Sequence, residues 1–264
     1  MSTLPVYVGV IVLVGLIGTT ATTCVMLWRG ALTAGLGRRT AIRVATATAI
    51  VWAGWAMTSA LLAHADVLRF APERKLPGLA VAVIAGLAVA FLITRVPPVA
   101  RILAQPDALW GLTLPQVFRP VGGAFLVAMA LGRLPALFAL PAGLGDIAIG
   151  IEAAFVARAI RRGTVLQRGI GLRRDVAGRR TVWLNILGLA DLVVAFGIGY
   201  AAAPGRAQLL FVWPSTEAIS TLPLVLIPTA VVPLAVTLHV LSLRKLWAAV
   251  PSGTPTAAPV RSTP

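Results

Sequence analysis

Six polar side chains stand inside long apolar stretches of this sequence, where a chain normally avoids them. They are Arg119, Asp146, Glu152, Asn185, Asp191 and His239. A charged side chain at the centre of a bilayer carries a penalty of about 2.5–3.5 kcal/mol on insertion scales, so it faces a partner or a water-filled cavity. Two carboxylates that share a site can hold one proton between them. The six residues are therefore the candidate site for a proton, an ion or a substrate.

Helix geometry places the two aspartates at one depth. At 1.5 Å per residue, Asp146 lies roughly 16 Å into an apolar run that begins near Pro135, and Asp191 lies roughly 14 Å into the next run. The two runs are expected to cross in opposite directions, so both aspartates come near the middle of the membrane. Asp146 and Glu152 are roughly 240° apart around one helix. We therefore expect the site to form between helices. The other members are expected at a second level nearer the cytoplasm: Arg119, Glu152, Asn185 and His239.

Polar residues at these positions are compatible with three functions. In a small permease or a proton- or cation-coupled transporter, Asp146 and Asp191 are the midplane groups and a wet cavity reaches them. In a non-catalytic membrane scaffold or accessory subunit, the aspartates pair with an arginine and lock helices together. In an intramembrane enzyme acting on lipid, a lateral opening exposes at least three polar groups. The transporter is our first hypothesis.

The composition of the chain indicates which kind of structure positions these residues. The chain has 264 residues, of which 58% are hydrophobic. A soluble domain of this length cannot hide so much apolar surface. The net charge of +15 would suggest nucleic acid in a soluble protein. Here the basic residues cluster in short connections between apolar runs, which is typical of membrane topology, with anionic lipid as the expected partner and no nucleic acid.

The apolar runs predict an all-α membrane protein with a bundle of about seven transmembrane helices. They are placed near residues 5–28, 42–63, 77–96, 118–133, 135–159, 182–203 and 221–243. The transmembrane domain covers 1–249, and the tail, 250–264, is disordered by composition. The segment 98–117 is apolar but interrupted by Pro106 and Pro115, so we expect it to be interfacial or re-entrant.

Charge distribution predicts the orientation. Most of the 23 lysines and arginines fall after the first, third and fifth predicted helices and in the C-terminal segment. In a seven-helix protein these connections share one side. The positive-inside rule then puts the N-terminus outside and the C-terminus in the cytoplasm.

The familiar motifs of catalysis and cofactor binding are missing. The sequence has no P-loop, no G-x-S-x-G, no H-E-x-x-H and no C-x-x-C. Cys24 is the single cysteine, so no intrachain disulfide is possible. We assign no catalytic, cofactor-binding or metal-binding residues, expect no cofactor, and favour a non-enzymatic role.

The second half of the chain contains the stretches FRPVGGAFLVAMALGRLPALFALPAGLGDIAIGI, WLNILGLADLVVAF and PLVLIPTAVVPLAVTLHVLSL. These stretches resemble hypothetical integral membrane proteins of GC-rich bacteria. The resemblance covers residues 116–246, about half the chain, and implies a multi-pass protein of the bacterial cytoplasmic (inner) membrane. It carries no activity and transfers no functional residue.

Overall fold

The computed structural model describes residues 4–70, 77–166, 176–205 and 208–248, and their regular structure is helical. Seven segments of these residues are long and apolar enough to cross a membrane. They are Val6–Thr33, Gly37–His64, Gly78–Arg95, Ala108–Ala130, Ala136–Gly163, Gly178–Ala201 and Ile227–Ala248. The all-α class and the seven helices are thus confirmed, and the chain is a multi-pass membrane protein. The orientation stays a prediction, and the tail 250–264 lies outside the described residues.

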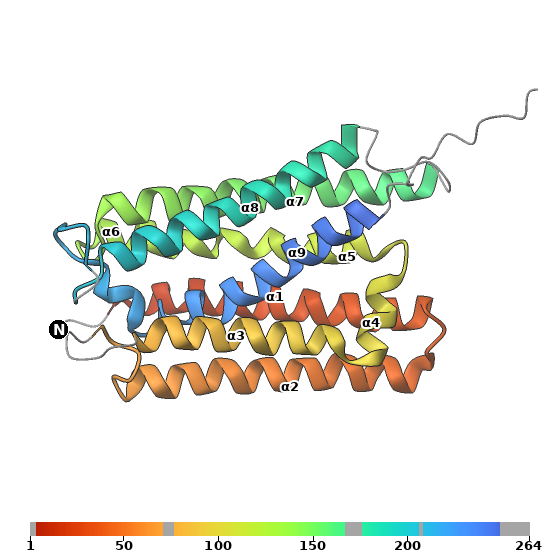
Figure 1. Ribbon diagram of the computed structural model, residues 1–264, viewed down its shortest axis with the longest axis horizontal. Helices are drawn as coiled ribbons and strands as arrows, with labels where there is room; N and C mark the ends of the chain where they lie inside the picture. The colour runs from red at the N-terminus through yellow and green to blue at the C-terminus, as the bar shows by residue number, and fades with distance from the viewer. Residues whose placement is uncertain (1–3, 71–76, 167–175, 206–207, 249–264) are drawn as a thin grey trace, which may run out of the picture.

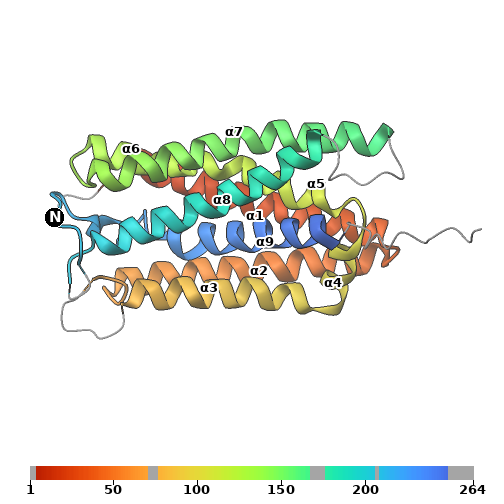
Figure 2. The same cartoon turned by 45° about the horizontal axis from the view of Figure 1, so that its top comes forward.

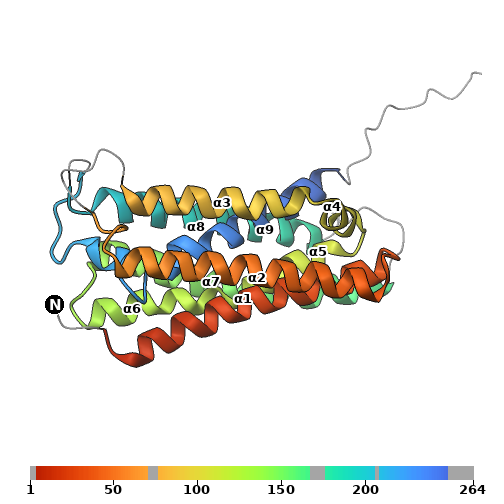
Figure 3. The ribbon, with the colours of Figure 1, turned by 90° about the horizontal axis from the view of Figure 1, so that it is seen from below.

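The helices run along the long axis of the molecule, and successive crossings are antiparallel (Figure 1). The long ones are α1 (Val6–Thr33), α2 (Gly37–His64), α3 (Gly78–Arg95), α7 (Ala136–Leu166), α8 (Val176–Ala201) and α9 (Val232–Ala248). Between α3 and the next crossing, α4 (Pro97–Ala104) lies across the end of the bundle farthest from the N-terminus. Seen from below, α1 and α2 run side by side (Figure 3).

The fourth crossing is built from three short helices in line: α5 (Ala108–Thr113), η1 (Leu114–Gly122) and α6 (Gly123–Ala130). It begins at Ala108, well before the expected 118, so 108–117 belongs to the crossing and α4 remains as the transverse piece of the 98–117 segment. The middle piece, η1, is a 3₁₀-helix that contains Pro115 and Pro120. Proline supplies no backbone N–H, so the regular α-helical pattern is interrupted here.

Close packing against η1 depends on glycine. A Cβ on Gly15 of α1 would overlap Val121, and one on Gly18 would overlap Phe118. Small residues let helix backbones approach closely in membranes. The η1 segment is therefore held at the centre of the bundle, between α1 and α7.

The last crossing starts with a π-helical turn, η3 (Ile227–Val231), before α9. In an α-helix the carbonyl of Thr229 would accept a hydrogen bond from the N–H of residue 233, but Pro233 has none. The indole Nε1 of Trp55 on α2 donates to this carbonyl instead, at 2.8 Å. The proline thus frees a buried carbonyl, and a tryptophan from a neighbouring helix satisfies it.

Candidate functional site

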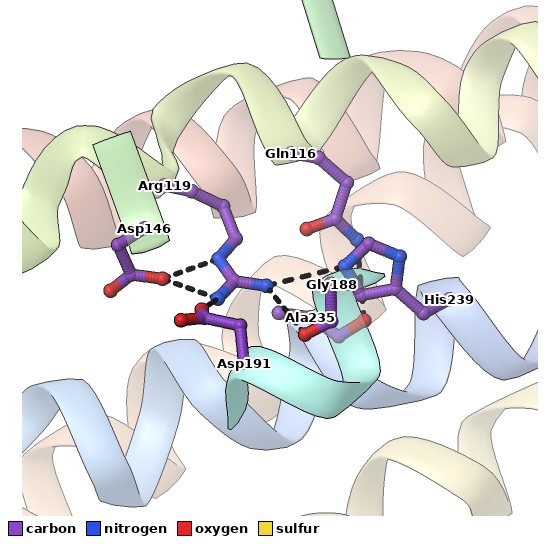
Figure 4. Close-up of polar contacts among 7 residues, drawn as sticks. All are labelled: Gln116, Arg119, Asp146, Gly188, Asp191, Ala235 and His239. Atoms are coloured by element: carbon purple, nitrogen blue, oxygen red, sulfur yellow. Dashed lines mark hydrogen bonds and ion pairs between the residues drawn. The ribbon is translucent and has the colours of Figure 1, made fainter. Parts of the chain in front are cut away.

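Arg119 is the centre of the polar cluster in the membrane domain (Figure 4). It lies on η1, and its side chain is only 3% exposed. The polar side chains that surround it come from α7, α8 and α9. A guanidinium is always charged and can only donate hydrogen bonds. The neighbours of Arg119 must therefore supply acceptors and negative charge.

Two aspartates share this guanidinium. Arg119 Nε donates to Asp146 Oδ1 on α7 at 2.5 Å. Its Nη2 atom pairs with the same oxygen and also with Asp191 Oδ2 on α8. The side chain of Asp191 is 14% exposed, against 9% for Asp146. Arg119, Asp146 and Asp191 are called the trio below. When both carboxylates are ionised, the trio carries one net negative charge.

A hydrogen-bond chain leads away from the other edge of the guanidinium. Arg119 Nη1 donates to Gly188 O and to His239 Nε2, each at 3.3 Å. Because Nε2 accepts, the ring proton is assigned to His239 Nδ1, which donates to Asn185 Oδ1 at 2.8 Å. Asn185 Nδ2 then donates to Thr181 O at 2.7 Å. The chain joins η1, α9 and the first half of α8.

The 3₁₀ geometry of η1 explains why a second polar residue points the same way. Side chains three residues apart eclipse one another in a 3₁₀-helix. Gln116 and Arg119 are such a pair, and Gln116 Nε2 donates to Ala235 O of α9 at 3.2 Å. Gln116 is buried. It anchors η1 to α9 beside His239, as Figure 4 shows.

Glycines make the room that the cluster occupies. A Cβ on Gly122 would overlap the carboxylate of Asp146, and a Cβ on Gly145 would overlap that of Asp191. Likewise, a Cβ on Gly188 would overlap the imidazole of His239. These three helical positions thus exclude any larger residue while the two carboxylates and the imidazole keep their places.

Glu152 is the predicted member that lies elsewhere. It forms an ion pair with Arg180, whose Nη2 lies 2.7 Å from Oε2. The two side chains are 32% and 47% exposed, respectively. The structure thus brings together five of the six predicted residues, with Asp146 and Asp191 on one side of Arg119 and His239 on the other. Glu152 faces away, as its angle around α7 requires.

Asp146 and Asp191 line a cavity of about 50 Å³, whose other walls are apolar and aromatic. The aromatic lining comes from Phe70, Phe125, Phe138, Phe196 and Tyr200. At about 10–15 Å³ of accessible volume per water, it has room for a few waters or one small polar group. In the part of the chain that the structure describes, no three His, Cys, Asp or Glu side chains gather as metal ligands.

Two features of the site could hardly be predicted from the sequence: the position of Gln116 and the aromatic lining of the cavity. Gln116 would have been found only by assuming a 3₁₀-helix, in which it shares a face with Arg119. The aromatic lining comes from segments far apart in the chain, such as Phe70 before α3 and Tyr200 at the end of α8. Periodicity within one helix cannot reveal such a gathering.

Comparison with known proteins gives one relationship. No curated protein and no solved structure matches the chain. A family model described as a domain of unknown function, DUF8737, matches residues 76–247. The match covers more than half of the chain and includes every residue of the Arg119 cluster. The chain therefore belongs to the DUF8737 family.

Proposed function

We propose that this protein is a small permease coupled to a proton or another monovalent cation, with Arg119, Asp146 and Asp191 as its midplane binding group. The observation that carries the proposal is the sharing of one buried guanidinium by two carboxylates that face a cavity. Transporters bind substrates and coupling ions near the bilayer midplane, among groups of this kind.

The charge balance argues for an exchangeable ion. A structural bridge needs one carboxylate to neutralise Arg119, and Asp146 fills that role with the more buried side chain. The second carboxylate, Asp191, adds a negative charge in a region of low dielectric, which is unfavourable unless a cation compensates for it. A proton on Asp191 removes this charge and leaves the Arg119–Asp146 pair intact. Asp191 is thus the group that exchanges the proton.

The surroundings of Arg119, Asp146 and Asp191 differ on the two sides of the guanidinium. The cavity extends from Asp191 toward Tyr200, near the C-terminal end of α8. The hydrogen-bond chain through His239 and Asn185 extends toward Thr181, near the N-terminal end of the same helix. A proton or cation bound at Asp191 therefore lies beside a cavity that reaches toward one end of α8, and beyond the Arg119 guanidinium a polar chain leads toward the other end.

Orientation and location complete the proposal. The lysine and arginine distribution supports an N-terminus outside and a C-terminus in the cytoplasm, with anionic lipid against the basic connections. The resemblance to hypothetical membrane proteins of GC-rich bacteria supports a bacterial inner membrane. In this orientation the cavity lies toward the outside and the chain from His239 to Thr181 lies toward the cytoplasm.

The scaffold hypothesis has an observation in its favour as well. Both aspartates are paired with Arg119, and the cluster ties η1, α7, α8 and α9 together. In that case neither carboxylate exchanges a proton. A lipid-acting enzyme has less support, because the two carboxylates that line the cavity are both engaged by Arg119.

A pH jump distinguishes these functions without knowledge of the substrate. Purified protein in liposomes is adsorbed to a solid-supported membrane, and the solution pH is stepped between about 8 and 5. Proton uptake from one side to a midplane group moves charge through part of the bilayer, so we expect a transient current from the wild type and none from Asp191→Asn. Glu152→Gln, which removes the exposed carboxylate, is the control and should keep the current. A wild type without a current would support the scaffold and overturn the proposal.

A further inference from the structure

We propose that the cavity beside Asp191 binds a monovalent organic cation with an aromatic or alkyl body, which enters sideways from the membrane between α3 and α8. This inference rests on the proposed function and names the class of its substrate. It follows from three features of the cavity: where its walls come from, which aromatic pairs they hold, and what charge lies at the base.

The walls of the cavity come from two helices that are separated by a third. Leu79 and Ala80 of α3 form one wall, and Ala195 and Phe196 of α8 form the other. Residues of η3 and the start of α9, including Pro228, lie between them. Figures 1 and 2 both show α9 between α8 and α3. The cavity is therefore a groove between α3 and α8 that faces the hydrocarbon region, through which an apolar molecule can arrive from the bilayer.

Two aromatic pairs line this groove. Phe196 and Tyr200 stack with ring centroids 6.4 Å apart and an interplanar angle of 9°. Phe125 and Phe138 meet edge to face, with centroids 5.1 Å apart and an angle of 69°. Aromatic faces attract cations and also bury apolar surface. A ligand that combines a positive charge with an apolar body uses both properties at once.

The charge at the base of the groove selects the sign of the ligand. The Arg119–Asp146–Asp191 trio is negative by one charge when both carboxylates are ionised. Among the described lining residues, Asp146 and Asp191 are the acidic groups that can supply this charge. A neutral ligand would leave the charge uncompensated, and an anion would be repelled. A monovalent cation neutralises it.

The size of the cavity fixes how such a ligand lies. A cavity of about 150 Å³ is known to hold a benzene ring, whereas this one measures about 50 Å³. It therefore accepts a small ammonium group but no ring. The charged head sits at Asp191, and the apolar body extends past Phe196, which is 40% exposed, toward the membrane.

Binding of the cation is coupled to release of a proton. The head group and the proton neutralise the same charge, so both cannot occupy Asp191 at once. When the cation arrives, the O–H bond of the protonated Asp191 carboxyl breaks, the proton leaves to water, and the carboxylate pairs with the ammonium group. Exchange of one cation for one proton follows.

The test uses benzylammonium as the probe and full-length protein in lipid nanodiscs. Isothermal titration calorimetry in buffers of different ionisation enthalpy gives both the affinity and the number of protons released. At a pH where Asp191 starts protonated we expect about one proton released per cation, and at least about tenfold weaker binding of ethylbenzene, the neutral isostere. Asp191→Asn should bind the cation at least about tenfold more weakly. Ala195→Trp should fill the groove and weaken binding as well. Val193→Trp, on an exposed face of α8 outside the lining, is the control and should bind normally.

Each result separates the two proposals. Equal affinity for the cation and its neutral isostere would overturn the inference, because the groove would then be an apolar site without charge selection. A protein that gives the pH-jump current but binds no cation would also overturn it and leave the permease proposal standing. A protein that shows neither response would remove both.

Discussion

Replacement of Arg119 by glutamine is expected to destabilise the protein by about 3–5 kcal/mol, because it leaves Asp146 and Asp191 buried next to one another without a counter-charge. The neutral amide keeps most of the side-chain volume, so lost packing explains little of the effect. Thermal unfolding in nanodiscs measures it as a large drop in the unfolding midpoint, or as loss of folded protein from the membrane fraction.

Two further variants show whether charge is the cause. Arg180→Gln removes a guanidinium that also pairs with a carboxylate, but at the exposed Glu152, so we expect no measurable change in stability. The triple variant Arg119→Gln, Asp146→Asn, Asp191→Asn carries no buried charge in the trio and should recover most of the loss. Wild-type stability in Arg119→Gln alone would contradict the arrangement around Arg119.

The variant Gly145→Ala should destabilise the protein by about 1–3 kcal/mol, although alanine normally favours a helix over glycine. The added methyl group would occupy the position of Asp191 Oδ1 and force that carboxylate away from Arg119. The pH-jump current should be reduced in the same variant, because the geometry that holds the exchangeable proton is lost. Chemical or thermal unfolding, together with the current, measures both effects.

Gly197→Ala is the matched control for this change. Gly197 lies on α8, and a Cβ there would have no heavy atom within 4 Å among the described residues. The substitution should therefore stabilise the helix by up to about 1 kcal/mol and leave the current unchanged. If Gly145→Ala behaved like Gly197→Ala, the close contact between α7 and Asp191 would be refuted.

The pairing of Asp146 with Asp191 illustrates what a sequence can reveal about a membrane site. Helix rise alone predicted a common depth, and the angle between Asp146 and Glu152 predicted that the site forms between helices. The structure places both aspartates on one guanidinium and Glu152 elsewhere. Depth and angle are local properties of a regular helix, so they can be calculated before the helices are packed.

The position of Arg119 shows what such reasoning lacks. Pro106 and Pro115 set the segment 98–117 apart from the fourth predicted helix, which put Arg119 at the start of that helix. The crossing instead begins at Ala108 and continues through Pro115 as a 3₁₀-helix. Counted from Ala108 at about 1.5 Å per α-helical residue and about 2.0 Å per 3₁₀ residue, Arg119 lies roughly 19 Å into the crossing, near its middle. Proline interrupts an α-helix, but only tertiary packing decides whether the chain turns away or continues.

The aromatic groove could not be predicted from the sequence at all. Its walls depend on α3 and α8 standing on either side of α9, and no local pattern encodes that arrangement. Phe196 and Tyr200 are four residues apart and predict a stacked pair on one helix face, but the sequence does not say which helix they face. Packing between distant segments creates the cavity that the two aspartates line.

The most direct test of an exchangeable proton on the trio is infrared difference spectroscopy during a pH titration in lipid bilayers. A protonated carboxyl has a C=O stretching band that a carboxylate lacks, and deuterium exchange shifts that band. We expect one such band to appear in the wild type on acidification, to persist in Glu152→Gln and to be absent from Asp191→Asn. If the wild type and Asp191→Asn gave identical spectra throughout the titration, Asp191 would hold no exchangeable proton and the trio would be a structural ion pair.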